Sequence, residues 1–174
     1  MVIKQTHEEF KAAMIFAAST QLLDVRLAAS KVFSQRPPVQ SFDVFETRLN
    51  LGFDLAVISA AQAVVPVSVI LKLIAGAEPD AKELVEIECT FEATYAFRPE
   101  FTPTDEQVTA FQAGNTVFNC WPFFREFLQS SLQKMGYPVP PLPLLRLDPE
   151  RPNQRGSEVK SAARKRLGPK PSED

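Results

Sequence analysis

The stretch FNCWPFFREFLQSSLQKMGYPVPPLPLLRL, residues 118–147, sets a run of large apolar side chains directly beside a run of prolines. Its first half predicts a helix with one buried face, because apolar residues recur at spacings of three and four. They are Phe124, Phe127, Leu128, Leu132 and Met135. Pro122 is expected to end an earlier helix and to occupy the first turn of this one. Gly136 is expected to cap its C-terminus.

The second half, from Gly136 to Leu147, predicts an extended segment. Proline lacks an amide hydrogen and restricts the backbone, so neither a helix nor a central strand suits this part of the chain. The prolines are Pro138, Pro140, Pro141 and Pro143. We expect the segment to form a stiff apolar wall that keeps Tyr137, Leu142 and Leu144 near the surface.

Four strands are predicted upstream of this stretch. Apolar and polar residues alternate over residues 23–29, 48–57 and 84–97, as is typical of half-buried antiparallel strands, and residues 64–74 form an apolar run between them. The clearest alternation places five apolar residues on one side of the second strand. They are Leu49, Leu51, Phe53, Leu55 and Val57. Residues 75–83 are expected to form a turn.

Two further helices are predicted, one at each end of the strand region. The first covers about residues 6–19, and its apolar face is expected to carry Phe10, Met14 and Ala17 or Ala18. The second begins near Thr104, which forms a capping box with Gln107. Its inner face is expected to carry Val108, Phe111 and Phe118.

These elements predict an α+β fold with a short N-terminal helix, a four-stranded antiparallel sheet and two C-terminal helices. Residues 1–147 are expected to form one domain. Residues 148–174 are rich in arginine and lysine and poor in large apolar side chains, which predicts a disordered basic tail. Because such a sheet carries more apolar area than two helices cover, we expect a symmetric oligomer.

Composition and motifs argue against several classes of function. A formal net charge of −2 and a pI near 5.6 disfavour nucleic-acid binding. No apolar run reaches eighteen residues and the N-terminus lacks a signal-peptide pattern, so we expect no membrane insertion and a cytoplasmic protein.

Catalytic chemistry has no candidate residues in the sequence. The single histidine, His7, has no oriented partner, and Cys89 and Cys120 lack metal-ligand spacing and are expected to be buried thiols. No glycine-rich phosphate loop is present. Glu86, Glu88 and Glu92 share one strand face and predict a solvated surface rather than an acid–base cluster. We therefore expect no enzyme activity, no metal and no cofactor.

The order of elements, together with two short motifs, resembles the SecB family of export chaperones. The motif WPFFRE, residues 121–126, matches the aromatic-Pro-aromatic-x-Arg-Glu start of the family's second helix. The motif GYPVPPLPLLRL, residues 136–147, matches the Gly-aromatic-Pro end of that helix and the leucines that follow. The resemblance covers about residues 22–147. It implies an ATP-independent holdase, a homotetramer built as a dimer of dimers, that binds unfolded polypeptide in apolar grooves.

Carried over to this sequence, the resemblance implies ten client-binding residues on the second strand, the aromatic motif and the segment after the helix. They are Leu49, Leu51, Phe53, Trp121, Phe123, Phe124, Tyr137, Leu142, Leu144 and Leu147. Large apolar side chains suit varied clients because the burial of apolar area is non-directional and contributes ~25 cal/mol per Å². Main-chain pairing at a strand edge would add hydrogen bonds.

Departures from the export pattern favour a different branch of the family. The positions that match the carboxylates with which export SecB proteins dock the SecA motor are Ser30, Ser34 and Lys72, none of them acidic. A basic tail replaces the last helix, and a helix is added at the N-terminus. These features resemble the SecB-like chaperones of toxin–antitoxin systems, which bind and protect an antitoxin. We therefore favour an antitoxin client over preprotein export to SecA, and retain a non-catalytic adaptor of the same fold as a third alternative.

Overall fold

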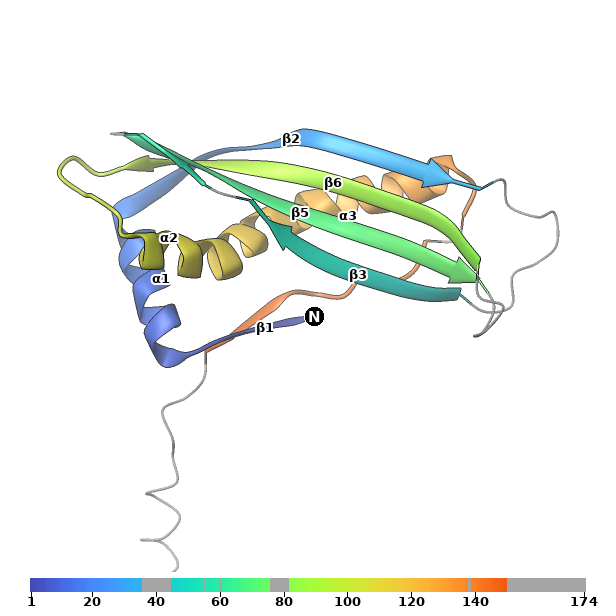
Figure 1. The fold of residues 1–174 in the computed structure, drawn as a ribbon, viewed down its shortest axis with the longest axis horizontal. Coiled ribbons are helices and arrows are strands. Elements are labelled where there is room, and N and C mark those ends of the chain that lie inside the picture. Colours follow the sequence, from blue (N-terminus) through green and yellow to red (C-terminus); the bar gives the residue numbers. More distant parts are fainter. Residues whose placement is uncertain (36–44, 55, 60, 76–81, 138, 150–174) are drawn as a thin grey trace, which may run out of the picture.

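The computed structural model describes residues 1–35, 45–54, 56–59, 61–75, 82–137 and 139–149. The elements confirm the predicted α+β class (Figure 1). In chain order they are β1 (Val2–Gln5), α1 (His7–Ser19), β2 (Thr20–Ser34), β3 (Phe45–Phe53), β4 (Val57–Ile58), β5 (Gln62–Ala75), β6 (Lys82–Phe97), α2 (Asp105–Phe111), the π-helical turn η1 (Gln112–Thr116), α3 (Val117–Lys134) and β7 (Arg146–Pro149). Most of the predicted turn after Ala75 and the predicted tail beyond Pro149 lie outside the described residues.

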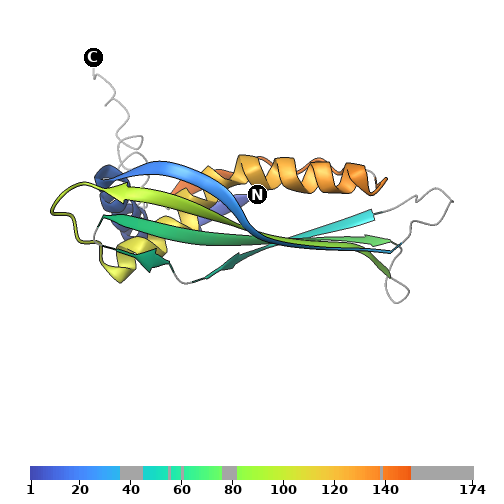
Figure 2. The same ribbon diagram turned by 90° about the horizontal axis from the view of Figure 1, so that it is seen from above.

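The main sheet contains the four predicted strands in the order β2-β6-β5-β3, all antiparallel. The second of them was predicted to run to Val57, but β3 ends at Phe53 and Val57 lies in the separate strand β4. The short strand β4 pairs with β5 as well, beyond the end of β3. Alternate side chains of β5 and β6 are buried, and those between them are half-buried, as expected for a sheet packed on one face. The helix α3 runs along one side of this sheet (Figure 2). The hydrophobic core therefore lies between the sheet and the helices.

Helix α1 begins with a complete capping box, in which the Thr6 hydroxyl accepts a hydrogen bond from the Glu9 amide and the Glu9 carboxylate accepts one from the Thr6 amide. The predicted apolar face was wrong at Met14, although Ala17 of that face does pack against the core. Ala12, Ala13 and Phe16 are buried, whereas Met14 is exposed. The Phe16 ring decides the orientation, because it packs in a cluster of aromatic rings. These belong to Tyr95, Phe97, Phe101 and Phe111, at centroid distances of 4.5 to 6.4 Å.

The helical region from Asp105 to Lys134 corrects the prediction that a helix ends at Pro122. Thr104 and Gln107 form the predicted capping box, but Pro122 lies inside α3, and the change in helix geometry occurs earlier, at η1. The proline ring is exposed, while its neighbours Trp121 and Phe124 are buried, so core packing holds the chain helical on both sides of it. Phe118, expected on the inner face, is instead exposed.

The segment after α3 confirms the extended conformation that its prolines predict. Gly136 has a φ of 75°, and the Tyr137 amide donates to the Leu132 carbonyl oxygen, as in a glycine-capped helix end. The chain then runs back along α3 and ends in β7 (Figure 1). The sequence did not predict that β7 pairs in parallel with β1, where Gln5 lies opposite Pro149.

Candidate functional site

Strand β3 forms one edge of the main sheet and carries the apolar residues predicted for the second strand. Leu49, Leu51 and Phe53 lie opposite buried residues of β5, so they face the same side of the sheet as the core. Leu49 and Leu51 are half-buried, and Phe53 is 48 % exposed. Since β3 pairs only with β5 among the described strands, its outer edge has free backbone groups to which an extended chain could pair.

The aromatic motif at the start of α3 separates into packing residues and an exposed one. Phe124 is fully buried and meets the Phe91 ring edge-on at a centroid distance of 4.9 Å. Trp121 is buried too, and its indole Nε1 donates to the Pro143 carbonyl oxygen at 3.0 Å. Phe123 remains 44 % exposed although its centroid is 6.1 Å from that of Phe91. Among the aromatic residues of this motif, only Phe123 therefore offers an accessible ring.

The extended segment corrects the expectation that Tyr137 and Leu142 stay near the surface. Both are buried, and the Tyr137 hydroxyl donates to the Gln35 carbonyl oxygen, which ties the end of α3 to the end of β2. The bond replaces hydration of the hydroxyl, as burial of a tyrosine requires. Leu144 is 68 % exposed, as predicted, and Leu147 is half-buried in β7 opposite Ile3.

The ten predicted residues thus fall into three groups by accessibility. Phe53, Phe123 and Leu144 are exposed. Leu49, Leu51 and Leu147 are half-buried. The buried group consists of Trp121, Phe124, Tyr137 and Leu142. In this conformation only the first two groups can contact another chain, and the buried group instead packs the C-terminal segment onto the core.

Sequence reasoning missed a second apolar surface, on the opposite edge strand β2. Every residue of β2 from Gln21 to Ser34 is exposed except Val25, although this strand pairs with β6 along its whole length. Its exposed large apolar residues are Leu22, Leu23, Leu27, Val32 and Phe33. The signal was present as adjacent apolar pairs at residues 22–23 and 32–33, which place apolar side chains on both faces of a strand.

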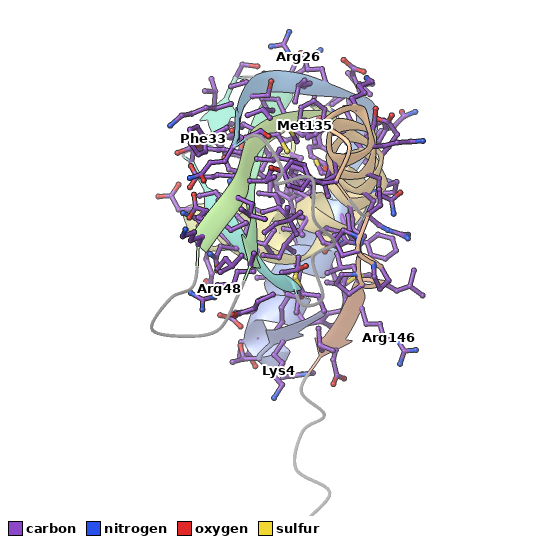
Figure 3. The ribbon with its side chains drawn as sticks, turned by 90° about the vertical axis from the view of Figure 1, so that its right-hand side faces the viewer. Lys4, Arg26, Phe33, Arg48, Met135 and Arg146 are labelled. Atoms are coloured by element: carbon purple, nitrogen blue, oxygen red, sulfur yellow. The ribbon has the colours of Figure 1, made fainter. Side chains whose placement is uncertain are left out.

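Ion pairs occupy the face of the sheet that points away from the core. Arg26 and Glu92 lie 2.8 Å apart, and Lys72 contacts both Glu83 and Glu86. The Lys72 ammonium donates hydrogen bonds to these two carboxylates, which raises the pKa of Lys72, and the bond from Lys72 lowers the pKa of Glu86. These side chains are all partly exposed, which agrees with the predicted solvated surface. Arg26, Phe33 and Arg48 all lie at the outside of the sheet in Figure 3.

The two cysteines and the single histidine are the side chains considered as nucleophile, base or metal ligand. Cys89 and Cys120 are buried, as predicted, and burial raises the pKa of each thiol to about 12. His7 is exposed at the start of α1. In the part of the chain that the structure describes, no three His, Cys, Asp or Glu residues gather as metal ligands. Nor is any described helix both long and apolar enough to cross a bilayer.

Comparisons with known proteins identify the fold. No protein-family model and no curated protein matches the chain. Among solved structures, it is similar to the SecB-like chaperone Rv1957 of Mycobacterium tuberculosis in complex with a ChAD peptide from the HigA1 antitoxin Rv1956. The TM-score is 0.67 at 21 % sequence identity, over 80 % of this chain and 99 % of that one. A protein of unknown function from Streptococcus agalactiae gives a TM-score of 0.40 at 8 % identity, over 72 % of this chain and 97 % of that chain. The chain therefore has the fold of a SecB-like chaperone.

Proposed function

We propose that this protein is an ATP-independent holdase that binds aggregation-prone polypeptide along β3. The observation that carries the proposal is the outer edge of β3, with which no other described strand pairs, next to apolar side chains that are still accessible. Phe53 is exposed there, and Leu49 and Leu51 are half-buried beside it. Stable monomers usually protect such an edge with charge, proline or a covering element.

The geometry suits an extended client. Backbone groups of the client would pair with the free edge of β3, which provides affinity without regard to sequence. Alternate client side chains would then meet Leu49, Leu51 and Phe53, because these residues recur with the period of two that a strand imposes. Phe123 and Leu144 are the accessible members of the predicted set on the other two elements, and we assign them to the same surface. No step in this mode of binding needs nucleotide, metal or another cofactor.

We propose an antitoxin segment as the client. The similar chaperone from M. tuberculosis was solved with a peptide of an antitoxin. General export through SecA is the second candidate, and the sheet surface disfavours it. Ser30 and Ser34 carry no charge, and the Lys72 ammonium is already paired with Glu83 and Glu86. A non-catalytic adaptor that has lost client binding remains the third candidate.

We also propose self-association into a dimer of dimers in the cytoplasm. The support comes from β2, which is the other edge strand of the sheet and exposes five large apolar side chains. Isologous pairing of two β2 strands would satisfy the free edge and bring these side chains of the two copies next to one another. Residues 1–147, extended to Pro149 by β7, would act as the chaperone domain, and the basic residues that follow would form a separate tail.

The test is suppression of aggregation by purified protein in the absence of ATP. Chemically unfolded citrate synthase is diluted into buffer, and its light scattering is followed with increasing amounts of the chain. Suppression that saturates near a fixed ratio of chain to client supports the holdase. If the assembly forms but scattering is unchanged for this client and for an antitoxin encoded beside the gene, the adaptor is favoured. Tight binding of a SecA C-terminal peptide would instead favour export.

A further inference from the structure

Trp121, Tyr137 and Leu142 were predicted to bind clients, but they are buried where the C-terminal segment packs onto the core. Leu142 and Leu145 of the segment 139–149 are buried against the core, yet four of its eleven residues lack an amide hydrogen, namely Pro140, Pro141, Pro143 and Pro149. Its attachment depends on the burial of Leu142 and Leu145 and on the bond from the Trp121 indole. The N-terminus adds the pairing with β1 and a bond of 3.1 Å from the Met1 ammonium to the Leu144 carbonyl oxygen.

Strand β1 is the external support of this segment. Val2 to Gln5 pair in parallel with Arg146 to Pro149, and the Arg146 amide donates to the Met1 carbonyl oxygen at 3.2 Å. The two strands form a sheet of their own, separate from the main sheet. A two-stranded sheet is marginally stable in water, and the apolar burial of this strand is limited. Val2 is exposed, whereas Ile3 and the preceding Met1 are half-buried and pack against the core.

A single buried side chain anchors β1 to the helices. Gln5 is buried, and its Nε2 donates to the Ala110 carbonyl oxygen in α2 at 2.7 Å. The same amide group lies against Gly114 of η1, where an added Cβ would come within 2.8 Å of Nε2. The anchor therefore depends on two features, the amide of Gln5 and the missing side chain at position 114.

We infer that β1 is a clasp whose release lets residues 139–149 move away from α3 and exposes further apolar surface to a client. A short pairing with little apolar burial, held by one buried amide, is the part of the fold that opens most readily without global unfolding. Opening frees Leu142 and Leu145 and uncovers the Trp121 indole. Leu142 and Trp121 were predicted to bind clients, and they become accessible only in this state. The consequence for clients rests on the proposed function, whereas the opening itself does not.

A reversible disulfide tests the clasp within one protein. Lys4 and Asp148 are exposed and opposite each other in the pairing of β1 with β7, so their Cα atoms lie about 5 Å apart, within the range for a disulfide. In the double variant Lys4→Cys/Asp148→Cys, oxidation locks the clasp and reduction releases it. The native Cys89 and Cys120 are buried and do not compete. The single variant Lys4→Cys, treated in the same way, is the control for oxidation.

The first measurement is binding of fluorescein-labelled, S-carboxymethylated α-lactalbumin, which cannot fold. We expect the oxidised double variant to bind it about tenfold more weakly than the reduced one, with the single variant unchanged. Equal affinity in both redox states, with wild type binding normally, overturns the inference. Stronger binding by the oxidised form overturns it too.

The second measurement needs no client, so it separates failure of the clasp from failure of the proposed function. Gln5→Ala removes the anchor, and Gln133→Ala, at an exposed position of α3, is its matched control. We expect hydrogen exchange of the β7 amides that pair with β1, first of all that of Arg146, to be about tenfold faster in Gln5→Ala than in wild type, with β5 unchanged. If these amides exchange as slowly as the core amides in both proteins, the clasp does not open separately from global unfolding. If these amides respond as expected but no variant binds polypeptide, the result supports the opening of the clasp and refutes the holdase function.

Discussion

The substitution Phe53→Ala tests whether β3 is the client-binding edge. Phenylalanine buries about 150–250 Å² when fully covered, so its exposed 48 % leaves about 100 Å² for a client to cover. Truncation to alanine removes about 80 Å² of this area. At ~25 cal/mol per Å² the loss is about 2 kcal/mol, which corresponds to ~30-fold in Kd when the client covers the whole ring.

The chain offers a closely matched control in Phe33→Ala. Phe33 is 49 % exposed and also lies on an edge strand, but it is opposite Glu86 on the outer face of β2. The two truncations therefore remove similar exposed and buried area, and they should lower the free energy of unfolding by similar amounts. Their effects on client binding should differ, because only Phe53 lies on the proposed surface.

The assay is fluorescence anisotropy of a labelled unfolded polypeptide, with circular dichroism to verify folding and light scattering to record the mass of the assembly. We expect Phe53→Ala to weaken binding by ten- to thirtyfold at unchanged mass. Phe33→Ala should alter the mass of the assembly and leave affinity per chain within about twofold. Equal losses of affinity for both variants, or none for Phe53→Ala, would refute the assignment of the groove to β3.

Two further predictions concern the core. Gly114→Ala should leave the free energy of unfolding within about 1 kcal/mol of wild type, because the gain in helix propensity offsets the loss of the Gln5 hydrogen bond. The same variant should speed hydrogen exchange in β7. Unchanged exchange in β7 would show that Gln5 tolerates the new Cβ. Burial raises the pKa of the Cys89 and Cys120 thiols from 9.0 to about 12, so neither should react with a disulfide reagent at pH 8 until the protein unfolds. Because these thiols ionise first in the unfolded chain, the free energy of unfolding should fall as the pH rises from about 9 toward 12, and a rise in chemical denaturation midpoints over this range would contradict their burial.

The strands were predictable because their signals are local. Residues 84–97 alternate in polarity over their whole length, and β6 spans Lys82–Phe97. The capping box of Thr104 with Gln107 and the Gly136 cap were also predicted correctly, because each depends on a few neighbouring residues. Local signals failed where tertiary packing decides. Pro122 is tolerated inside α3 because the side chains on either side of it are buried.

The candidate site was harder to predict than the fold, since the accessibility of a side chain is a property of the whole structure. Leu49 and Phe53 both follow the alternating pattern, but only the pairing of β3 at the sheet edge leaves them reachable. The clasp could not be predicted at all, because the partners in β1 and β7 are more than 140 residues apart and neither strand is long enough to give a periodic signal.

The coexistence of apolar residues and prolines in residues 136–147 now has a physical explanation. The prolines withhold backbone donors, so side-chain donors supply hydrogen bonds that secondary structure would otherwise provide. The Trp121 indole bonds the segment at Pro143, and the Tyr137 hydroxyl bonds the end of β2 at Gln35. Such a wall is stiff along its length but weakly attached, because each bond acts at one point. Leu144 is exposed on this segment, whereas Leu142 is buried. The same segment therefore presents some apolar surface in the closed state and would expose more when it opens.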